Sequence, residues 1–232
     1  MLWRPQPAYT PELLAQWRAL GQALGHDTPA WRAEGRRLVL SWSRWPRAYH
    51  DTTHLWACLR HLQSAQDQQP GAIQNPLAVA LAIWYHDAIY WPWSGRNEER
   101  SAAWSTRFLH SQHVPAALQA TVHQYILDTR HNANVDIDAG DPGPDVQWVV
   151  DIDLAVLGQS EAVYRRFEHN VRREYFFVRW PRYVAGRSAV LQGFLDHPRI
   201  YQNAWFFDRY EAQARTNLHH ALQALRSGRL YD

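Results

Sequence analysis

The sequence has no lysine, a single cysteine and no long apolar run. All 24 basic residues are arginine, which excludes Schiff-base chemistry on a lysine and the lysine of a phosphate-binding loop. With Cys58 alone, the chain can form neither an internal disulfide nor a Cys-x-x-Cys metal or redox site. Because Cys58 lies among Leu55, Leu59 and Leu62 at helical spacing, we expect it to be an inert core thiol.

The longest strongly apolar stretch, from Pro76 to Tyr85, is followed at once by His86 and Asp87. It is too short to span a membrane, since a crossing helix needs about 20 apolar residues. The first residues, Met-Leu-Trp-Arg-Pro, lack the basic start and apolar run of a secretory signal. We therefore expect a cytoplasmic protein without a membrane partner.

The charges are nearly balanced, with a formal net charge of +2 over 232 residues. Such a chain is long enough to bury a sizeable core, and we expect one domain over residues 1–232, with two small domains as the alternative. Its core is expected at about 45–160, with C-terminal helices at about 161–226 packed on it. The arginines are spread along the chain, so nucleic acid is not an expected partner. The sequence leaves a homo-oligomer open.

Signals for helix starts and helical periodicity cover most of the chain, so we predict an all-α fold. Thr10-Pro11, Thr28-Pro29 and Asn75-Pro76 each resemble a capping residue followed by proline at the first helical position. Apolar residues spaced by three and four then predict further helices. The predicted ranges, uncertain by about 2 to 4 residues at each end, are 51–64, 77–90, 98–110, 116–129, 146–157, 161–177, 182–195 and 204–225.

The doublet His86-Asp87 is unusual because it ends the most apolar helix predicted for the chain. At helical spacing, Ile83 and Tyr90 lie about one turn to either side of it, so both ionisable groups should face apolar surroundings. Buried charges need partners. Metal coordination would satisfy both groups, and a buried His–Asp hydrogen bond between two helices is the structural alternative.

Asp153 is a second candidate, because its helical neighbours are the aliphatic Val149, Val150, Val156 and Leu157. This spacing predicts that Asp153 lies on the buried face of its helix. Asp151, about 200° around the same helix, should lie on the wetter face.

His50 and His54 are four residues apart at a predicted helix start. That spacing can supply two ligands to one metal ion, or one ligand and a neighbouring acid or base. The alternative is a pair of surface histidines, since the chain has 13 histidines and some pairs arise by chance.

A histidine, then a His-Asp doublet, then a distant aspartate resembles the signature of the HD-domain superfamily of metal-dependent phosphohydrolases. Five segments between about residues 45 and 220 resemble a bacterial branch of predicted HD phosphohydrolases. They are Tyr49 to His54, Trp84 to Asp87, Asn97 to Ala102, Asp151 to Gly158, and Ala214 to Leu218. The resemblance implies a helical bundle of HD type.

The resemblance also implies that a divalent ion is bound by His54, His86, Asp87 and Asp153. Mixed nitrogen and oxygen donors suit Mn, Fe, Co, Ni or Mg. One ion is expected, and a second remains open because extra histidines follow the doublet, as in the two-metal branches of the family.

The expected catalytic residues are Asp87 and Glu98. Many relatives carry a catalytic glutamate shortly after the doublet, where this chain has Ile89, so the candidate substitutes are Glu98 and Glu99, of which Glu98 is preferred. Acidic residues in the first turn of a helix, such as Glu98 and Glu99, also stabilise the helix dipole without any catalytic role. Three side chains are expected to contact the substrate: His50, His131 and Arg172.

These features together predict hydrolysis of a phosphate ester by a metal-activated water. The expected substrate is a small phosphorylated metabolite, with nucleotides as the leading class. Two alternatives remain: a metal- or nucleotide-binding module without turnover, suggested by Ile89, and an oxygen-using di-iron enzyme, as some relatives are.

Overall fold

The computed structural model describes residues 8–130 and 144–231, which form ten α-helices and one 3₁₀ helix and contain no strand. The prediction of an all-α fold is confirmed for these residues. Contacts divide the chain into two compact units, residues 1–129 and 130–232, and the prediction of a single domain stays a prediction. None of the described helices is long and apolar enough to cross a membrane.

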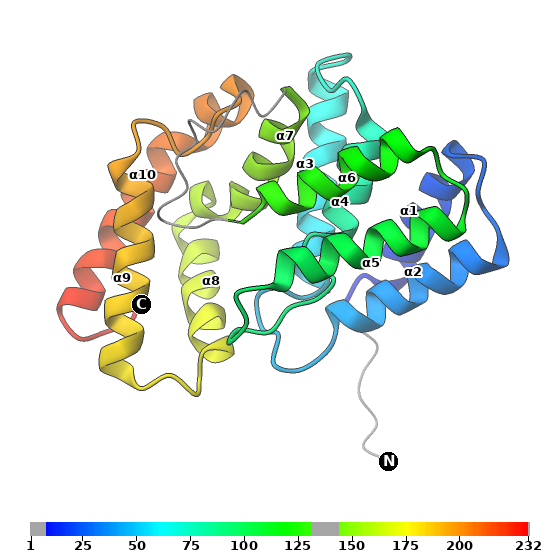
Figure 1. Ribbon diagram of the computed structural model, residues 1–232. Coiled ribbons are helices and arrows are strands. Elements are labelled where there is room, and N and C mark those ends of the chain that lie inside the picture. Colours follow the sequence, from blue (N-terminus) through cyan, green and yellow to red (C-terminus); the bar gives the residue numbers. More distant parts are fainter. Residues whose placement is uncertain (1–7, 131–143, 232) are drawn as a thin grey trace. The chain divides into compact units, whose positions relative to one another are not determined.

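The first unit contains six helices (Figure 1). Its central element is α4, whose residues from Leu81 to Tyr85 are all buried and which packs against α3, α5 and α6. The almost continuous apolar sequence of this helix explains its position, since a helix that is hydrophobic all round must be covered on every side. The helices are α1 (Thr10–Ala23), α2 (Pro29–Trp42), α3 (Thr52–Gln68), α4 (Pro76–Tyr85), α5 (Asn97–Ser111) and α6 (Ala116–Asp128).

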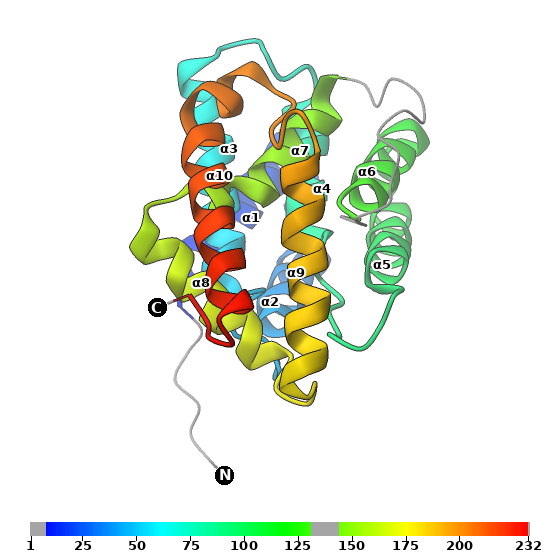
Figure 2. The same cartoon turned by 90° about the vertical axis from the view of Figure 1, so that its left-hand side faces the viewer.

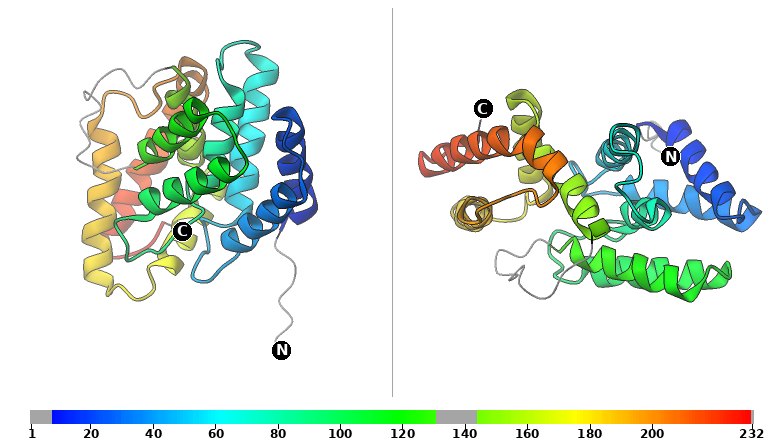
Figure 3. Two further views of the ribbon diagram at one scale, coloured as in Figure 1. Left: turned by 45° about the vertical axis from the view of Figure 1, so that its right-hand side comes forward. Right: turned by 90° about the horizontal axis from the view of Figure 1, so that it is seen from above.

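Helices α1 and α2 lie side by side (Figure 3) and are joined by a reciprocal pair of tryptophans. The indole N–H of Trp17 donates to the carbonyl of Trp31 at 2.7 Å, and that of Trp31 donates to the carbonyl of Trp17 at 2.9 Å. A Cβ atom at Gly35 would lie 2.3 Å from the Trp17 ring. Glycine at position 35 therefore allows the two helices to approach closely.

Two of the three predicted helix caps are confirmed. The side chain of Thr28 accepts a hydrogen bond from the backbone N–H of Trp31, and that of Asn75 accepts one from Ala78. The prediction for Thr10 is wrong, because Thr10 is already the first helical residue. The N-cap of α1 is Tyr9, in the left-handed region at φ 59°, without a side-chain hydrogen bond to the helix.

The second unit is built around α10, which packs against the 3₁₀ helix η1, α8 and α9; Figure 2 shows α9 and α10 as neighbours. The predicted helix 146–157 is in fact α7 followed by η1. The amide of Asn217 on α10 donates to the carbonyls of Leu157 and Gln159 at 2.8 and 2.9 Å, which fixes η1 against α10. The elements are α7 (Pro144–Leu154), η1 (Ala155–Gly158), α8 (Glu161–Glu174), α9 (Trp180–Asp196) and α10 (Ala204–Arg226).

Candidate metal centre

His86 lies at the C-cap of α4, because that helix ends at Tyr85 rather than at the predicted residue 90. The residue keeps helical dihedral angles and its side chain is buried. Its Nδ1 atom is 2.9 Å from the carbonyl oxygen of Ile83. Since a carbonyl only accepts hydrogen bonds, Nδ1 carries the proton and Nε2 carries the lone pair that a metal requires.

His54 lies in the first turn of α3, whose start is fixed by Asp51. The Asp51 carboxylate accepts hydrogen bonds from the backbone N–H groups of Thr53 at 2.7 Å and His54 at 3.4 Å. The His54 side chain is buried, and one of its ring nitrogens lies within 4.8 Å of a ring nitrogen of His86. The first unit therefore brings together two histidines that the sequence separates by 32 positions.

Asp87 lies beside both His86 and His50. Its Oδ2 atom is 3.7 Å from Nε2 of His86 and 3.9 Å from Nε2 of His50, and its side chain is 14% exposed. Asp87 is therefore half-buried, at the point where the chain turns after α4.

His50 precedes α3 rather than sharing a helix face with His54, since the helix begins at Thr52. The two imidazole rings still lie near each other, with centroids 5.8 Å apart. The His50 ring stacks on Tyr90 at a centroid distance of 4.2 Å. This stacking fixes a half-buried histidine beside Asp87, where the sequence predicts a contact to substrate.

Arg47 is a residue of this region that sequence reasoning missed. Its guanidinium donates to the carbonyls of His50 and Asp87, both at 2.7 Å, and to that of Ala88 at 3.2 Å. It also lies over the ring of Trp42, at 5.1 Å. Arg47 therefore connects the segment before α3 to the segment after α4. No spacing rule signals this role, since its acceptors are backbone oxygens 3 to 41 residues away.

The start of α5 is attached to the segment that follows the doublet. The Asn97 side chain accepts from the N–H of Trp91 at 3.1 Å and donates to its carbonyl at 3.0 Å. Ser101 accepts from the N–H of Ile89 at 3.0 Å. Glu98, next to Asn97, is half-buried beside this junction, and its acid or base role stays a prediction.

The sequence predicted that Asp153 is buried on α7, in the second unit, and that Asp151 lies on the wetter face of this helix. This prediction is wrong. Asp151 is fully buried and accepts hydrogen bonds from the N–H groups of Gln202 and Asn203 at 3.1 and 2.7 Å. Burial raises the pKa of its carboxyl to about 7. Asp153 is only half-buried. The helical pattern failed because the partners of Asp151 lie about 50 residues further along the chain.

The other two residues predicted to contact the substrate are Arg172 and His131. In the second unit, Arg172 donates to the carbonyls of Tyr175 and Val178 at 2.7 and 3.0 Å and lies over the ring of Tyr183. These contacts give it a structural role in the α8–α9 connection, and its contact to phosphate stays a prediction. His131 lies outside the described residues.

Cys58 is buried, as predicted, and its sulfur is 3.7 Å from both ring nitrogens of His54. His123, in contrast, is joined to the hydroxyl of Thr106 at 3.0 Å, between α6 and α5. This hydrogen bond gives His123 a structural role in the packing of α6 on α5.

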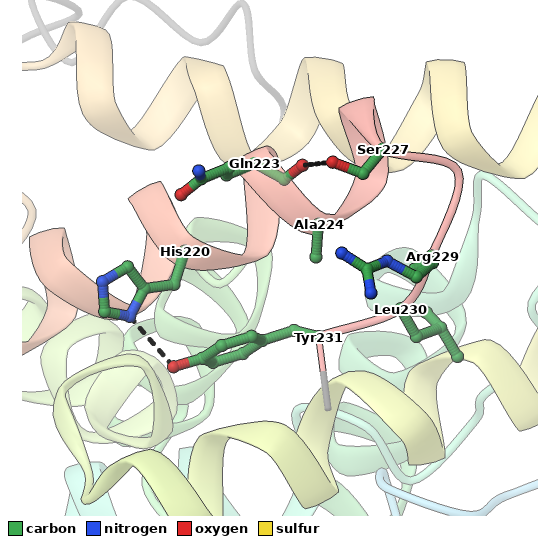
Figure 4. A pocket seen from close by; sticks show the side chains of 7 residues that line it. All are labelled: His220, Gln223, Ala224, Ser227, Arg229, Leu230 and Tyr231. Atoms are coloured by element: carbon green, nitrogen blue, oxygen red, sulfur yellow. Dashed lines mark hydrogen bonds between the residues drawn. The ribbon is translucent and has the colours of Figure 1, made fainter.

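The second unit has a hollow of about 260 Å³ at the end of α10. Figure 4 shows the Tyr231 hydroxyl directed at the imidazole of His220, with 3.0 Å between the oxygen and Nδ1. Arg229 and Ser227 also line the hollow. The C-terminal end of α10 is the negative end of its helix dipole, which repels an anion from the hollow. This repulsion counteracts the attraction of the positively charged Arg229.

Comparisons of the chain with models of protein families, with curated proteins and with solved structures find no match.

Proposed function

We propose that this protein is a metal-dependent phosphohydrolase of HD type that binds a divalent ion through His54, His86, Asp87 and Asp153. The observation that supports it most strongly is the approach of His54 and His86 within the first unit, with the Asp87 carboxylate next to His86. The assignment of Asp153, in the second unit, comes from the sequence pattern alone.

The donor atoms fit a divalent ion. Two ligands bound at about 2.1 Å to one ion lie at most about 4.2 Å apart. The 3.7 Å between His86 Nε2 and Asp87 Oδ2 lies within this limit. The ring nitrogens of His54 and His86, within 4.8 Å of each other, would need a shift of less than about 1 Å. Imidazole and carboxylate donors suit Mn, Fe, Co, Ni or Mg, as one ion or two.

A bound divalent ion supplies a water of lowered pKa and polarises a phosphate oxygen. The side chains position the reaction around it. The hydrogen bond from Nδ1 to Ile83 orients the His86 ring. We assign His50, 3.9 Å from the Asp87 carboxylate, the contact to a substrate phosphate. Glu98 follows Asn97, which is attached to the segment after the doublet, and we assign it the proton transfer in place of the glutamate whose position Ile89 occupies.

Metal content and phosphate release test this proposal. We expect purified protein to hold about one or two divalent ions per chain and to hydrolyse members of a panel of phosphate esters. Phosphomonoesters and nucleotides would release phosphate, and cyclic nucleotides would open to nucleoside monophosphates. The variants His86→Ala and Asp153→Asn should lose the ion and the activity. His110→Ala is the matched control, because His110 is exposed at the end of α5, and it should retain both.

A His86→Ala variant with its full metal content would contradict the proposal. A metal-replete protein that hydrolyses no compound of the panel would contradict the assigned activity. If that protein instead binds a nucleotide tightly and leaves it intact for hours, Ile89 in place of the glutamate favours a binding module without turnover.

A further inference from the structure

A groove of about 520 Å³ lies between α2 and α5 in the first unit. A hydrogen bond of 2.6 Å, from the indole N–H of Trp104 on α5 to the buried carboxylate of Glu34 on α2, joins the two helices at the groove. The volume is within the range of about 300–1,000 Å³ that is usual for small-molecule sites. Six side chains define its chemistry: Arg37, Leu40, Arg44, Trp104, Arg107 and Phe108.

The groove has an excess of positive charge. Three arginines line it, and Glu34 is the one acidic residue among its described lining residues. The Glu34 carboxylate is already engaged by the hydroxyl of Tyr85, the indole of Trp104 and the guanidinium of Arg37. Two positive charges of the three therefore remain without a balancing carboxylate.

Arg44 and Arg107 supply those two charges. Both side chains are exposed, and neither forms a hydrogen bond or an ion pair with any described residue. Guanidinium groups suit phosphate or carboxylate because their planar fork can donate two parallel hydrogen bonds. The two arginines therefore give the groove a preference for an anion.

Apolar and aromatic surface lies between the arginines. Leu40 is 61% exposed and belongs to the lining. Trp104 and Phe108, one turn apart on α5, are half-buried and present ring surface to the same hollow. An inorganic anion alone would leave this surface uncovered, whereas a planar ring could stack on it.

We propose that the α2–α5 groove binds a small organic anion in which a phosphate group is attached to a planar ring, of the nucleoside monophosphate class. The arginines bind the phosphate, and Leu40, Trp104 and Phe108 cover the ring. The inference does not rest on the proposed hydrolase activity. Ile89 also lines the groove, two residues after Asp87, so the ligand would contact the segment that bears the candidate metal ligands.

Calorimetric titration of the full chain in EDTA tests the groove with the candidate metal centre kept empty. The probes are AMP, adenosine and inorganic phosphate. We expect AMP to bind at least tenfold more tightly than either of its parts, because it alone engages both the arginines and the rings. Loss of one charge-assisted hydrogen bond in Arg44→Ala or Arg107→Ala should weaken AMP binding about tenfold.

Arg36→Ala and Arg100→Ala are matched controls, because these exposed arginines lie on the same two helices and do not line the groove. They should change the affinity for AMP less than twofold, as should His86→Ala. The inference is wrong if AMP does not bind at millimolar concentration, or if all four arginine variants weaken it equally. It is also wrong if His86→Ala abolishes binding, or if a glutamate-rich peptide binds and AMP does not.

Discussion

At the scale of single residues, the two nitrogens of His86 have different tasks. Nδ1 donates to the Ile83 carbonyl, which fixes the tautomer and the orientation of the ring. Nε2 is then the nitrogen that faces Asp87 at 3.7 Å. Metal-binding histidines usually show this division, since the hydrogen bond at one nitrogen determines the availability of the other.

Arg47 should matter for metal binding although it supplies no ligand. Arg47→Ala removes the bonds to the carbonyls of His50 and Asp87, so both side chains lose their fixed positions. We expect metal affinity to fall about 10- to 100-fold, as for other residues that orient ligands. Competition with a chromogenic chelator measures it. The exposed control Arg36→Ala should have no effect, and an unchanged affinity in Arg47→Ala would show that the ligands are positioned without it.

Asp27 should make the stability of the first unit depend on pH. Hydrogen bonds and charge from Arg32, and then from Arg18, hold the pKa of its carboxyl well below the ordinary value of 3.8. The unfolded chain therefore takes up the proton first as the pH falls. The stabilisation is complete above the ordinary pKa and is lost as the pH falls towards the native pKa.

The variant Asp27→Asn should accordingly melt at a lower temperature than the wild type at pH 7, and the difference should shrink as the pH falls from 5 to about 2. Thermal unfolding followed by circular dichroism measures both. Asp196→Asn is the control, because among the described residues that exposed carboxylate pairs only with Gln192. A difference for Asp27→Asn that stays constant over this range would refute the ion pair.

The sequence predicted some residues of the candidate centre and missed others for physical reasons. His86 could be found because an ionisable group among apolar residues needs a partner, and His54 because it lies four residues after His50. The two are buried and close to each other. The relative burial of Asp151 and Asp153 could not be predicted, because the N–H groups that bind Asp151 come from a distant segment. Arg47 was missed for the same reason.

At the scale of elements, the start of α4 was predictable and its end was not. Asn75 caps the helix locally, within three residues. The end depends on another segment, because the N–H groups of Ile89 and Trp91 donate to the side chains of Ser101 and Asn97 in α5. A longer helix would direct these donors to carbonyls four residues earlier, and apolar periodicity carries no information about their actual partners.

Gly158 should be essential for the packing of η1 on α10. A Cβ atom at this position would lie 2.5 Å from Cβ of Tyr210 and 2.7 Å from its carbonyl oxygen, so backbone would have to move. Gly158→Ala should lower the free energy of unfolding by about 1–3 kcal/mol or more. Unfolding in urea measures the change.

Gly186→Ala is the matched control, since Gly186 lies within α9 and nothing is within 4 Å of an added Cβ. This second substitution should raise the free energy of unfolding by about 0.5–1 kcal/mol, because alanine favours a helix more than glycine does. Equal effects of the two substitutions would mean that close packing at Gly158 is unimportant.

At the scale of the whole molecule, the proposed ion should stabilise the folded chain. An ion that binds only the native state at about 100 times its dissociation constant adds about 2.7 kcal/mol. For a chain of this length that corresponds to a rise of about 5–10 °C in the melting temperature. Thermal unfolding before and after EDTA treatment measures it. The effect should disappear in His86→Ala, and a wild-type protein indifferent to EDTA would contradict a structural contribution of the ion.

The single thiol of the molecule lies inside the first unit, where only 2% of Cys58 is exposed and its sulfur packs against His54. A thiol reagent can react with it only when α3 separates from its neighbours. The rate at which a thiol reagent labels Cys58 in the unmodified protein therefore measures how often the first unit opens, and no engineered probe is needed. A ligand that binds the protein and lowers this labelling rate stabilises the packing of α3 against its neighbours.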